Sequence, residues 1–285
     1  MTTIRHHHSR AYIAGGGIAG LAAAVYLIRE AGFAGRNITL FNEEHISGGA
    51  MDGAGSPARG YLIRGGRMHE EHFGCLWDLL SQIPTLEDPE LSVTQEMQAF
   101  NQRVVSCSHS RLLKGGQKLD VSSYGLSSCD TYDLLRLNMT PEALLGAKRI
   151  DEWFSAEFFD TVFWQLWATT FAFQKWSRLM EMRRYAIRFI HLLPGFNLLK
   201  GIMRTVYNQY HSVIAPIETW LRERGVNFRM KAPLLDVDFA LSADAKRATA
   251  FHISVVRAGR RSCWARMTTS LSPWARSWRV VPPAP

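Results

Sequence analysis

The first hydrophobic run of the chain, residues 11–14, is short and ends at three consecutive glycines. Residues 21–28 then read LAAAVYLI, an apolar, alanine-rich stretch that favours a buried helix. A second apolar run containing β-branched residues, NITLF at 37–41, predicts another strand. The order strand, glycine turn, helix, strand is typical of a βαβ unit with a parallel sheet. The predicted fold class is therefore α/β.

The glycines of the first turn have the G-x-G-x-x-G spacing of dinucleotide-binding turns. In such turns the first glycine permits the bend, the second lets the backbone approach a pyrophosphate, and the third lets helix and strand pack closely. The phosphates would lie at the helix N-terminus, where free N–H groups favour an anion. Polar side chains at the end of the second strand have the position that binds ribose hydroxyls. We predict a Rossmann-like dinucleotide site at Gly15, Gly17, Ala19, Gly20, Asn42 and Glu43, with an ordinary βαβ turn as the alternative.

A second glycine-rich segment, SGGAMDG, occupies residues 47–53. Gly48 and Gly49, followed by Asp52, would allow the backbone to approach the phosphates and ring of a flavin. The segment resembles that of flavoproteins of the phytoene-desaturase and amine-oxidase type. A flexible loop is the alternative interpretation. The motif RGGR at 64–67 follows, and we predict a helix over residues 70–82.

Longer segments resemble the oleate hydratases, flavoproteins also known as myosin-cross-reactive antigens. They lie at residues 64–89 (RGGRMHEEHFGCLWDLLSQIPTLEDP), 119–155, 158–191 and 207–221, and the similarity extends over nearly all of 11–254. The resemblance implies an FAD-binding domain in which Arg64, Gly65 and Gly66 contact the cofactor. It implies a structural FAD without net redox. It also implies addition of water to the cis-9 double bond of an unsaturated fatty acid, such as oleate or linoleate, to give a 10-hydroxy fatty acid.

Hydration of an isolated alkene needs an acid for one carbon and a base that activates water for the other. Tyr185 aligns with the tyrosine to which the family assigns the acid role. The usual glutamate base is replaced by Met68, whose thioether cannot take a proton from water. Glu70 or an ordered water could replace it, although Glu70 in a first helical turn could simply complement the helix dipole. Gln209 matches a family glutamine that helps to hold the fatty-acid carboxylate, with a surface amide as the alternative.

Residues 153–191 are dense in aromatic side chains, which predicts packed helices. A protein core and a tunnel for an acyl chain would use the same side chains, and the family resemblance favours the tunnel. The predicted domains are an FAD-binding segment over 1–80, a mainly helical substrate region over 81–200, a return to the FAD-binding domain over 201–254, and a tail over 255–285.

Charge is distributed unevenly along the chain. Residues 245–285 carry eight of the 33 Lys and Arg residues and no acid, so this stretch accounts for the formal net charge of +8. A basic tail is typical of an arm that binds nucleic acid or an anionic membrane. This tail has no helical or alternating period. We interpret it as a disordered product of a frameshift in a truncated chain, and expect no nucleic-acid partner.

The cysteines, the length of the apolar runs and the HEEH sequence indicate the location of the protein and whether it binds a metal. The four cysteines form no C-x-x-C pair, which favours reduced thiols in the cytoplasm. No apolar run is as long as a transmembrane helix, although a lipid substrate favours peripheral membrane contact. The HEEH sequence at 69–72 lacks the spacing of a zinc helix, so no metal is predicted. We expect a carbon–oxygen lyase. An FAD-dependent oxidoreductase or an inactive fragment is the alternative, and no oligomeric state follows from the pattern.

Overall fold

The computed structural model describes residues 9–53, 55–62, 67–108, 111–242, 245–257 and 260–265. The chain divides into two compact units, of which the first comprises Met1–Arg103 and Arg204–Pro285 and the second Val104–Met203. Each has its own hydrophobic core. The predicted cofactor residues Arg64, Gly65 and Gly66 and the tail beyond Ala265 lie outside the described residues.

A three-stranded parallel sheet with the order β1-β2-β7 lies in the first unit. Strand β1 (Ala11–Ala14) pairs with β2 (Ile38–Phe41), and β2 pairs with β7 (Asn227–Arg229). The two predicted strands are thus present and adjacent. The unit also contains helices, so the expected mixed α/β class with a parallel sheet is confirmed.

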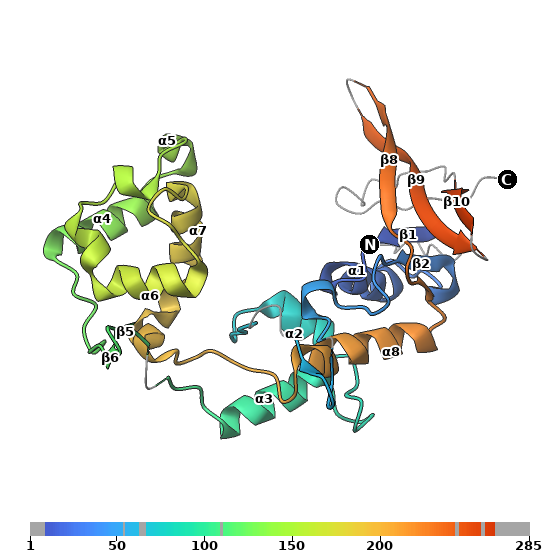
Figure 1. Cartoon of the computed structure of the whole chain (residues 1–285), viewed down its shortest axis with the longest axis horizontal. Coiled ribbons are helices and arrows are strands. Elements are labelled where there is room, and N and C mark those ends of the chain that lie inside the picture. The colour runs from blue at the N-terminus through green and yellow to red at the C-terminus, as the bar shows by residue number, and fades with distance from the viewer. Residues whose placement is uncertain are drawn as a thin grey trace. The chain divides into compact units, whose positions relative to one another are not determined.

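Helix α1 (Ile18–Arg29) packs against β1 and β2, and α8 (Ala215–Glu223) packs against α1, as Figure 1 shows. Leu21, Ala24 and Val25 of α1 are fully buried in this core. Alanine leaves room for the close approach of helix to strand, which explains the alanine-rich stretch in the sequence.

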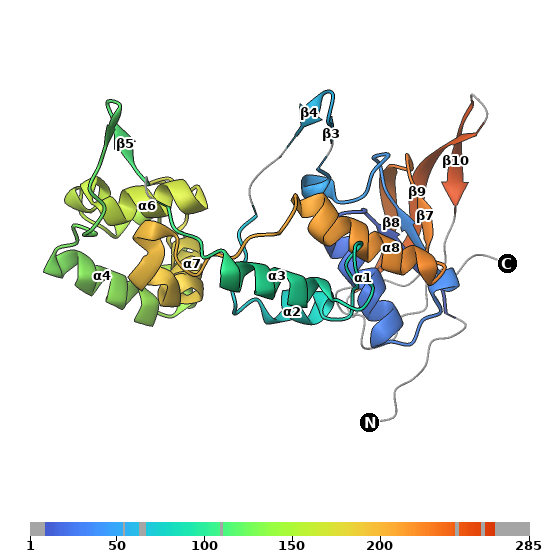
Figure 2. The ribbon, with the colours of Figure 1, turned by 90° about the horizontal axis from the view of Figure 1, so that it is seen from below.

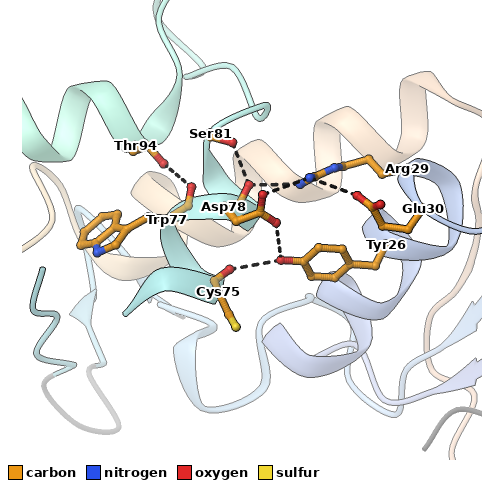
Figure 3. A network of polar contacts seen from close by, with 8 residues as sticks. All are labelled: Tyr26, Arg29, Glu30, Cys75, Trp77, Asp78, Ser81 and Thr94. Atoms are coloured by element: carbon orange, nitrogen blue, oxygen red, sulfur yellow. Dashed lines mark hydrogen bonds and ion pairs between the residues drawn. The ribbon is translucent and has the colours of Figure 1, made fainter. Parts of the chain in front are cut away.

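Helices α2 (Gly74–Leu80) and α3 (Val93–Arg103) belong to the first unit. Helix α2 begins at Gly74, so the predicted start at residue 70 was wrong. Its Asp78 contacts Tyr26 and Arg29 of α1 (Figure 3).

The boundary between the units differs from the predicted domain boundary. Ile83, Val93 and Met97 are fully buried in the core of the first unit. The helical unit therefore begins at Val104 instead of residue 81.

A second, antiparallel sheet with the order β10-β9-β8 also belongs to the first unit. It consists of β8 (Leu234–Leu241), β9 (Lys246–Arg257) and β10 (Arg260–Ala265). The structure differs from the predicted disordered tail at residues 255–257 and 260–265, because β9 continues to Arg257 and pairs with β10.

The second unit is mainly helical (Figure 2). Its longer helices are α4 (Ser128–Met139), α6 (Val162–Phe171) and α7 (Leu179–Phe189). Ser127 caps α4 in a capping box with Asp130, and the Thr161 hydroxyl accepts a hydrogen bond from the Trp164 N–H at the start of α6. These local signals fix where the helices begin.

The remaining elements are short. They are the helical turns η1 (Gly35–Asn37), η2 (Gly49–Met51), α5 (Glu142–Leu145), η3 (Ile150–Glu152), η4 (Glu157–Asp160), η5 (Ile190–Leu198) and η6 (Tyr210–Ile214), and the hairpins of β3 (Gly55–Ser56) with β4 (Gly60–Tyr61) and of β5 (Leu113–Lys114) with β6 (Gln117–Lys118). In the described part of the chain, no helix combines the length and the apolar character needed to cross a bilayer.

Candidate functional site

The glycine turn between β1 and α1 requires its glycines for different reasons. Gly15 has a φ of +104°, and its N–H donates to the carbonyl oxygen of Phe41 at 2.8 Å. A Cβ at Gly20 would lie 2.0 Å from the carbonyl oxygen of Gly15, so a side chain cannot be accommodated there without a shift of the backbone. A Cβ at Gly17 would meet nothing within 4 Å. The turn is therefore closed at Gly20 and open at Gly17.

The open position coincides with the N-terminus of α1. Gly17 is its N-cap residue, and no side chain caps this end. Ala19 lies in the first turn, which contains no acidic residue. Uncapped N–H groups and the helix dipole favour an anion at this end. Because Gly17 has no side chain, there is space for an anion next to the backbone, as a bound pyrophosphate would require.

Asn42 holds this turn in place. Its side chain is 7% exposed, and its Oδ1 accepts a hydrogen bond from the N–H of Gly16 at 3.1 Å. Its Nδ2 donates to the carbonyl oxygens of Glu44 at 3.2 Å and Ile46 at 2.8 Å. The amide is thus engaged with the backbone on both sides. Glu43, the other predicted ribose-binding residue, is exposed at the end of β2.

The second glycine-rich segment lies directly against the first. The N–H of Gly48 donates to the carbonyl oxygen of Gly16 at 2.8 Å, and Gly48 forms a parallel bridge with Gly17. A Cβ at Gly49 would lie 3.3 Å from the Cα of Gly17. The structure therefore brings together two of the segments that we predicted to contact the cofactor. Asp52 follows them and is 3% exposed.

A cavity of about 220 Å³ lies beside the second segment. Gln209, the predicted carboxylate-binding residue, is among its lining residues. The arginines Arg67 and Arg204 give this lining a positive character. The lining comprises Ala50, Met51, Gly53, Leu62, Arg67, Arg204, Thr205, Tyr207, Asn208, Gln209 and Tyr210.

The segment that contains the replaced base precedes α2. Met68 is half-buried and Glu70 is 1% exposed. The Oε2 atom of Glu70 accepts the N–H of His72 at 2.8 Å and lies 2.9 Å from its Nδ1. Because α2 begins at Gly74, Glu70 does not occupy a first helical turn, and the alternative in which it complements the dipole of that turn was wrong.

His69 lies between these two residues in the sequence. It was not predicted as a site residue from the sequence. Its side chain is 6% exposed, and its ring centroid lies 6.4 Å from that of Trp77. Burial lowers the pKa of this imidazole, which favours the neutral form. The signal that could have identified it is a histidine directly after the position where the family's glutamate is missing.

Tyr185, the predicted acid, belongs to α7 in the second unit. It is 41% exposed, and its ring contacts Phe171, Phe173 and Phe189 at centroid distances of 5.2, 5.2 and 5.8 Å. The aromatic ring is thus surrounded on one side by apolar groups while part of the residue reaches the surface of the unit.

The aromatic residues of the second unit mostly form its core. Phe158, Leu166 and Trp167 are at most 2% exposed. Phe163 and Trp167 also line an apolar cavity of about 170 Å³ within the unit, together with side chains of α4 and η5. The predicted core role of these side chains is thus confirmed, and the tunnel for an acyl chain stays a prediction.

The sequence model of the family described as MCRA matches residues 8–266. The chain belongs to the MCRA family. The match runs through β8, β9 and β10, which corrects our expectation that the resemblance ends at residue 254.

Two curated relatives of this MCRA chain are hydratases by name. An "Oleate hydratase" of Streptococcus pyogenes serotype M49 (strain NZ131) is 40% identical over 246 residues, which are 86% of this chain and 42% of the relative. A "Linoleate hydratase" of Lactiplantibacillus plantarum is 32% identical over 242 residues, covering 77% of this chain and 42% of the relative. The chain thus spans less than half the length of either.

Solved structures similar to the MCRA chain include a fatty acid isomerase from P. acnes that produces CLA, with a TM-score of 0.48 and 14% identity over 85% of this chain and 57% of that one. An oxidoreductase from Methanosarcina mazei has a TM-score of 0.47 and 14% identity over 90% of this chain and 57% of that one.

Proposed function

We propose that this chain carries the FAD-binding and proton-donating parts of a fatty acid hydratase. In this proposal water adds to the cis-9 double bond of oleate, or of a related substrate such as linoleate, and a 10-hydroxy fatty acid is formed. The observation that carries the proposal is the 40% identity to an oleate hydratase over 246 residues of this chain, within a family match over residues 8–266 that includes the glycine turn, Met68, Tyr185 and Gln209.

The geometry of the glycine turn supports a dinucleotide cofactor, for which we propose FAD. The space at Gly17 and the uncapped N-terminus of α1 suit a pyrophosphate, and Gly20 suits the close packing of α1 on β1. Gly15, Gly48, Gly49 and Asp52 would complete the backbone cradle, with Glu43 towards the ribose. Arg64, Gly65 and Gly66 belong to the proposed cofactor site through the family resemblance alone. When bound, FAD would shape the site without net redox.

Asn42 has a modified role in this proposal. Because its amide is engaged with Gly16, Glu44 and Ile46, we assign it to positioning the phosphate-binding turn. Its contact with the ribose remains a prediction.

The chemical step requires one proton donor and one water-activating group. We assign proton donation to the hydroxyl of Tyr185, which would give its proton to one alkene carbon while the water oxygen bonds to the other. One proton of the attacking water would pass to a base, and the other would remain in the hydroxyl group of the product. The candidates for this base, in place of Met68, are Glu70 and an ordered water. Gln209 would hold the substrate carboxylate, since its amide can donate to an anion.

The proposed domain roles follow from these assignments. The first unit would bind FAD, and the second would hold the hydrocarbon chain in its apolar cavity.

The cellular location that we propose follows from the cysteines and the substrate. Exposed free thiols at Cys75, Cys107 and Cys129 favour a reducing, cytoplasmic setting. A lipid substrate favours peripheral contact with a membrane.

Incubation of the purified chain with FAD and oleic acid, followed by mass spectrometry, tests this function. The proposal predicts a product heavier by one water, with the hydroxyl group at carbon 10. An oxidoreductase of the desaturase or amine-oxidase type is the second candidate, favoured by the two glycine segments that such enzymes share. Consumption of oxygen or reduction of an added acceptor, without hydration, would support that candidate and contradict the hydratase.

A further inference from the structure

His69 presents a buried nitrogen that the described residues leave without a hydrogen-bond partner. The side chain is 6% exposed, and its Nε2 atom is among the buried polar atoms that lack a partner. A buried unsatisfied polar group costs on the order of 1–3 kcal/mol, so native proteins rarely keep one without a water or ligand to satisfy it. The geometry thus indicates that a small polar molecule binds at this atom.

The charge state of His69 decides what such a molecule would be. Burial lowers the pKa of the imidazole, and no charged side chain contributes to that shift. The titratable groups nearby are engaged elsewhere: Glu70 is bound to His72, and Asp78 on the adjacent α2 is bound to Tyr26 and Arg29. A neutral imidazole has one nitrogen that accepts a hydrogen bond. In the tautomer with the proton on Nδ1, Nε2 is the acceptor, and a water that donates to it is the molecule that fits.

The neighbours of His69 place it on the segment where a base is needed. Met68, which precedes it, offers only a weakly accepting sulfur. Arg67, two residues before His69, lines the same cavity as Gln209. The carboxylate of Glu70 already accepts the backbone N–H of His72. Among these three consecutive residues, His69 has the side chain best suited to accept a proton from water.

We propose that His69 is the base that activates the attacking water; this assignment rests on the proposed hydratase function. As the water oxygen forms its bond to one alkene carbon, an O–H bond of the water breaks and the proton passes to the imidazole. The π electrons form a C–H bond with the proton from Tyr185 at the other carbon. Transfer of the proton from the imidazolium to the tyrosinate through solvent restores both residues. No oxidant or reductant is consumed.

Three variants test the assignment in the FAD-loaded full chain with oleic acid. His69→Gln should lower kcat by about 10²- to 10⁴-fold, the usual contribution of a general base, without a matching rise in KM. Glu70→Gln, the competing base, should change kcat far less. His45→Gln is the matched control, because this imidazole is exposed and has no role in the proposed site. Thermal unfolding and FAD titration of each variant report folding separately.

The pH dependence of kcat/KM supplies a readout that a structural role would not affect. Protonation of a histidine base abolishes its function, so the wild-type rate should fall as the pH decreases through the pKa of His69. NMR titration of the His69 ring in the wild-type chain should give the same pKa, below the ordinary value for histidine, and this measurement does not depend on a variant that folds.

The possible outcomes separate this inference from the function on which it rests. A wild-type chain that forms no hydroxy fatty acid overturns the proposed function and the inference with it. An active wild type whose His69→Gln variant keeps its turnover, or whose acid limb differs from the pKa of His69, overturns the inference alone. A large loss of kcat in Glu70→Gln with little loss in His69→Gln would assign the base to Glu70.

Discussion

At the scale of single residues, two glycines of one turn have opposite tolerance for a side chain. A Cβ at Gly20 would overlap the carbonyl oxygen of Gly15 at 2.0 Å, whereas a Cβ at Gly17 would enter open space. Gly20 is therefore required by the fold itself. Gly17 is required only if a ligand approaches the backbone there.

This difference predicts separate effects of two alanine variants. Gly20→Ala should lower the free energy of unfolding by roughly 1–3 kcal/mol, because the added methyl overpacks a rigid contact. Gly17→Ala should leave the free energy of unfolding nearly unchanged and weaken FAD binding. Chemical denaturation and FAD titration of both variants check these results. Equal FAD affinity of Gly17→Ala and the wild type would contradict a pyrophosphate at this position.

The roles of some single residues could not be predicted from the sequence. The glycine spacing predicted the turn, because backbone geometry there is local. The hydrogen bond from Gly16 to Asn42 joins positions 26 residues apart, and only the fold shows that this amide is engaged with the backbone. The burial of His69 likewise depends on residues distant in sequence, so its position in a polar HEEH sequence gave no indication of it.

At the scale of elements, polar contacts join α2 to α1. The hydroxyl of Tyr26 donates to Asp78 at 2.8 Å, and Arg29 donates to the same carboxylate at 3.2 Å (Figure 3). These hydrogen bonds, that of Arg29 foremost, lower the pKa of Asp78. Burial and the contact with Asp78 raise the pKa of Tyr26 to about 12, so the hydroxyl remains a donor at neutral pH.

The contact predicts a small, pH-dependent contribution to stability. Because the pKa of Asp78 is lower in the folded chain, its contribution is present above the unfolded pKa and is lost as the pH falls through the folded pKa. Asp78 is half-exposed, so Asp78→Asn should cost about 0.2–1 kcal/mol at neutral pH and less in acid. Urea unfolding of both proteins at several pH values measures this. A difference that is the same at every pH would contradict the assignment.

The elements that could be predicted are those with strong local signals. The apolar runs around residues 11 and 37 gave β1 and β2, and the alanine-rich stretch gave α1. Helix α2 was predicted too early, because the acidic residues before it suggested a first turn that the chain does not form. Residues 81–103 were assigned to the helical region, but Ile83, Val93 and Met97 are buried in the core of the first unit.

In the whole molecule, the proposed cofactor-binding and proton-donating residues belong to different units. The glycine segments lie in the first unit, and Tyr185 lies in the second, within its own aromatic surroundings. Loss of the hydroxyl at residue 185 should therefore leave FAD binding unaffected. Tyr185→Phe keeps the aromatic ring and its contacts, so it removes only the hydroxyl group that would donate the proton.

Proton donation by Tyr185 is tested most directly by comparing the hydration of oleic acid by the FAD-loaded wild type and by Tyr185→Phe, with Tyr132→Phe as control. Tyr132 lies in α4 of the same unit and is 65% exposed. We predict 10-hydroxystearate from the wild type and from Tyr132→Phe, and a loss of about 10²- to 10⁴-fold in Tyr185→Phe with unchanged FAD affinity. Full turnover by Tyr185→Phe, or no hydration by the wild type, would contradict the account.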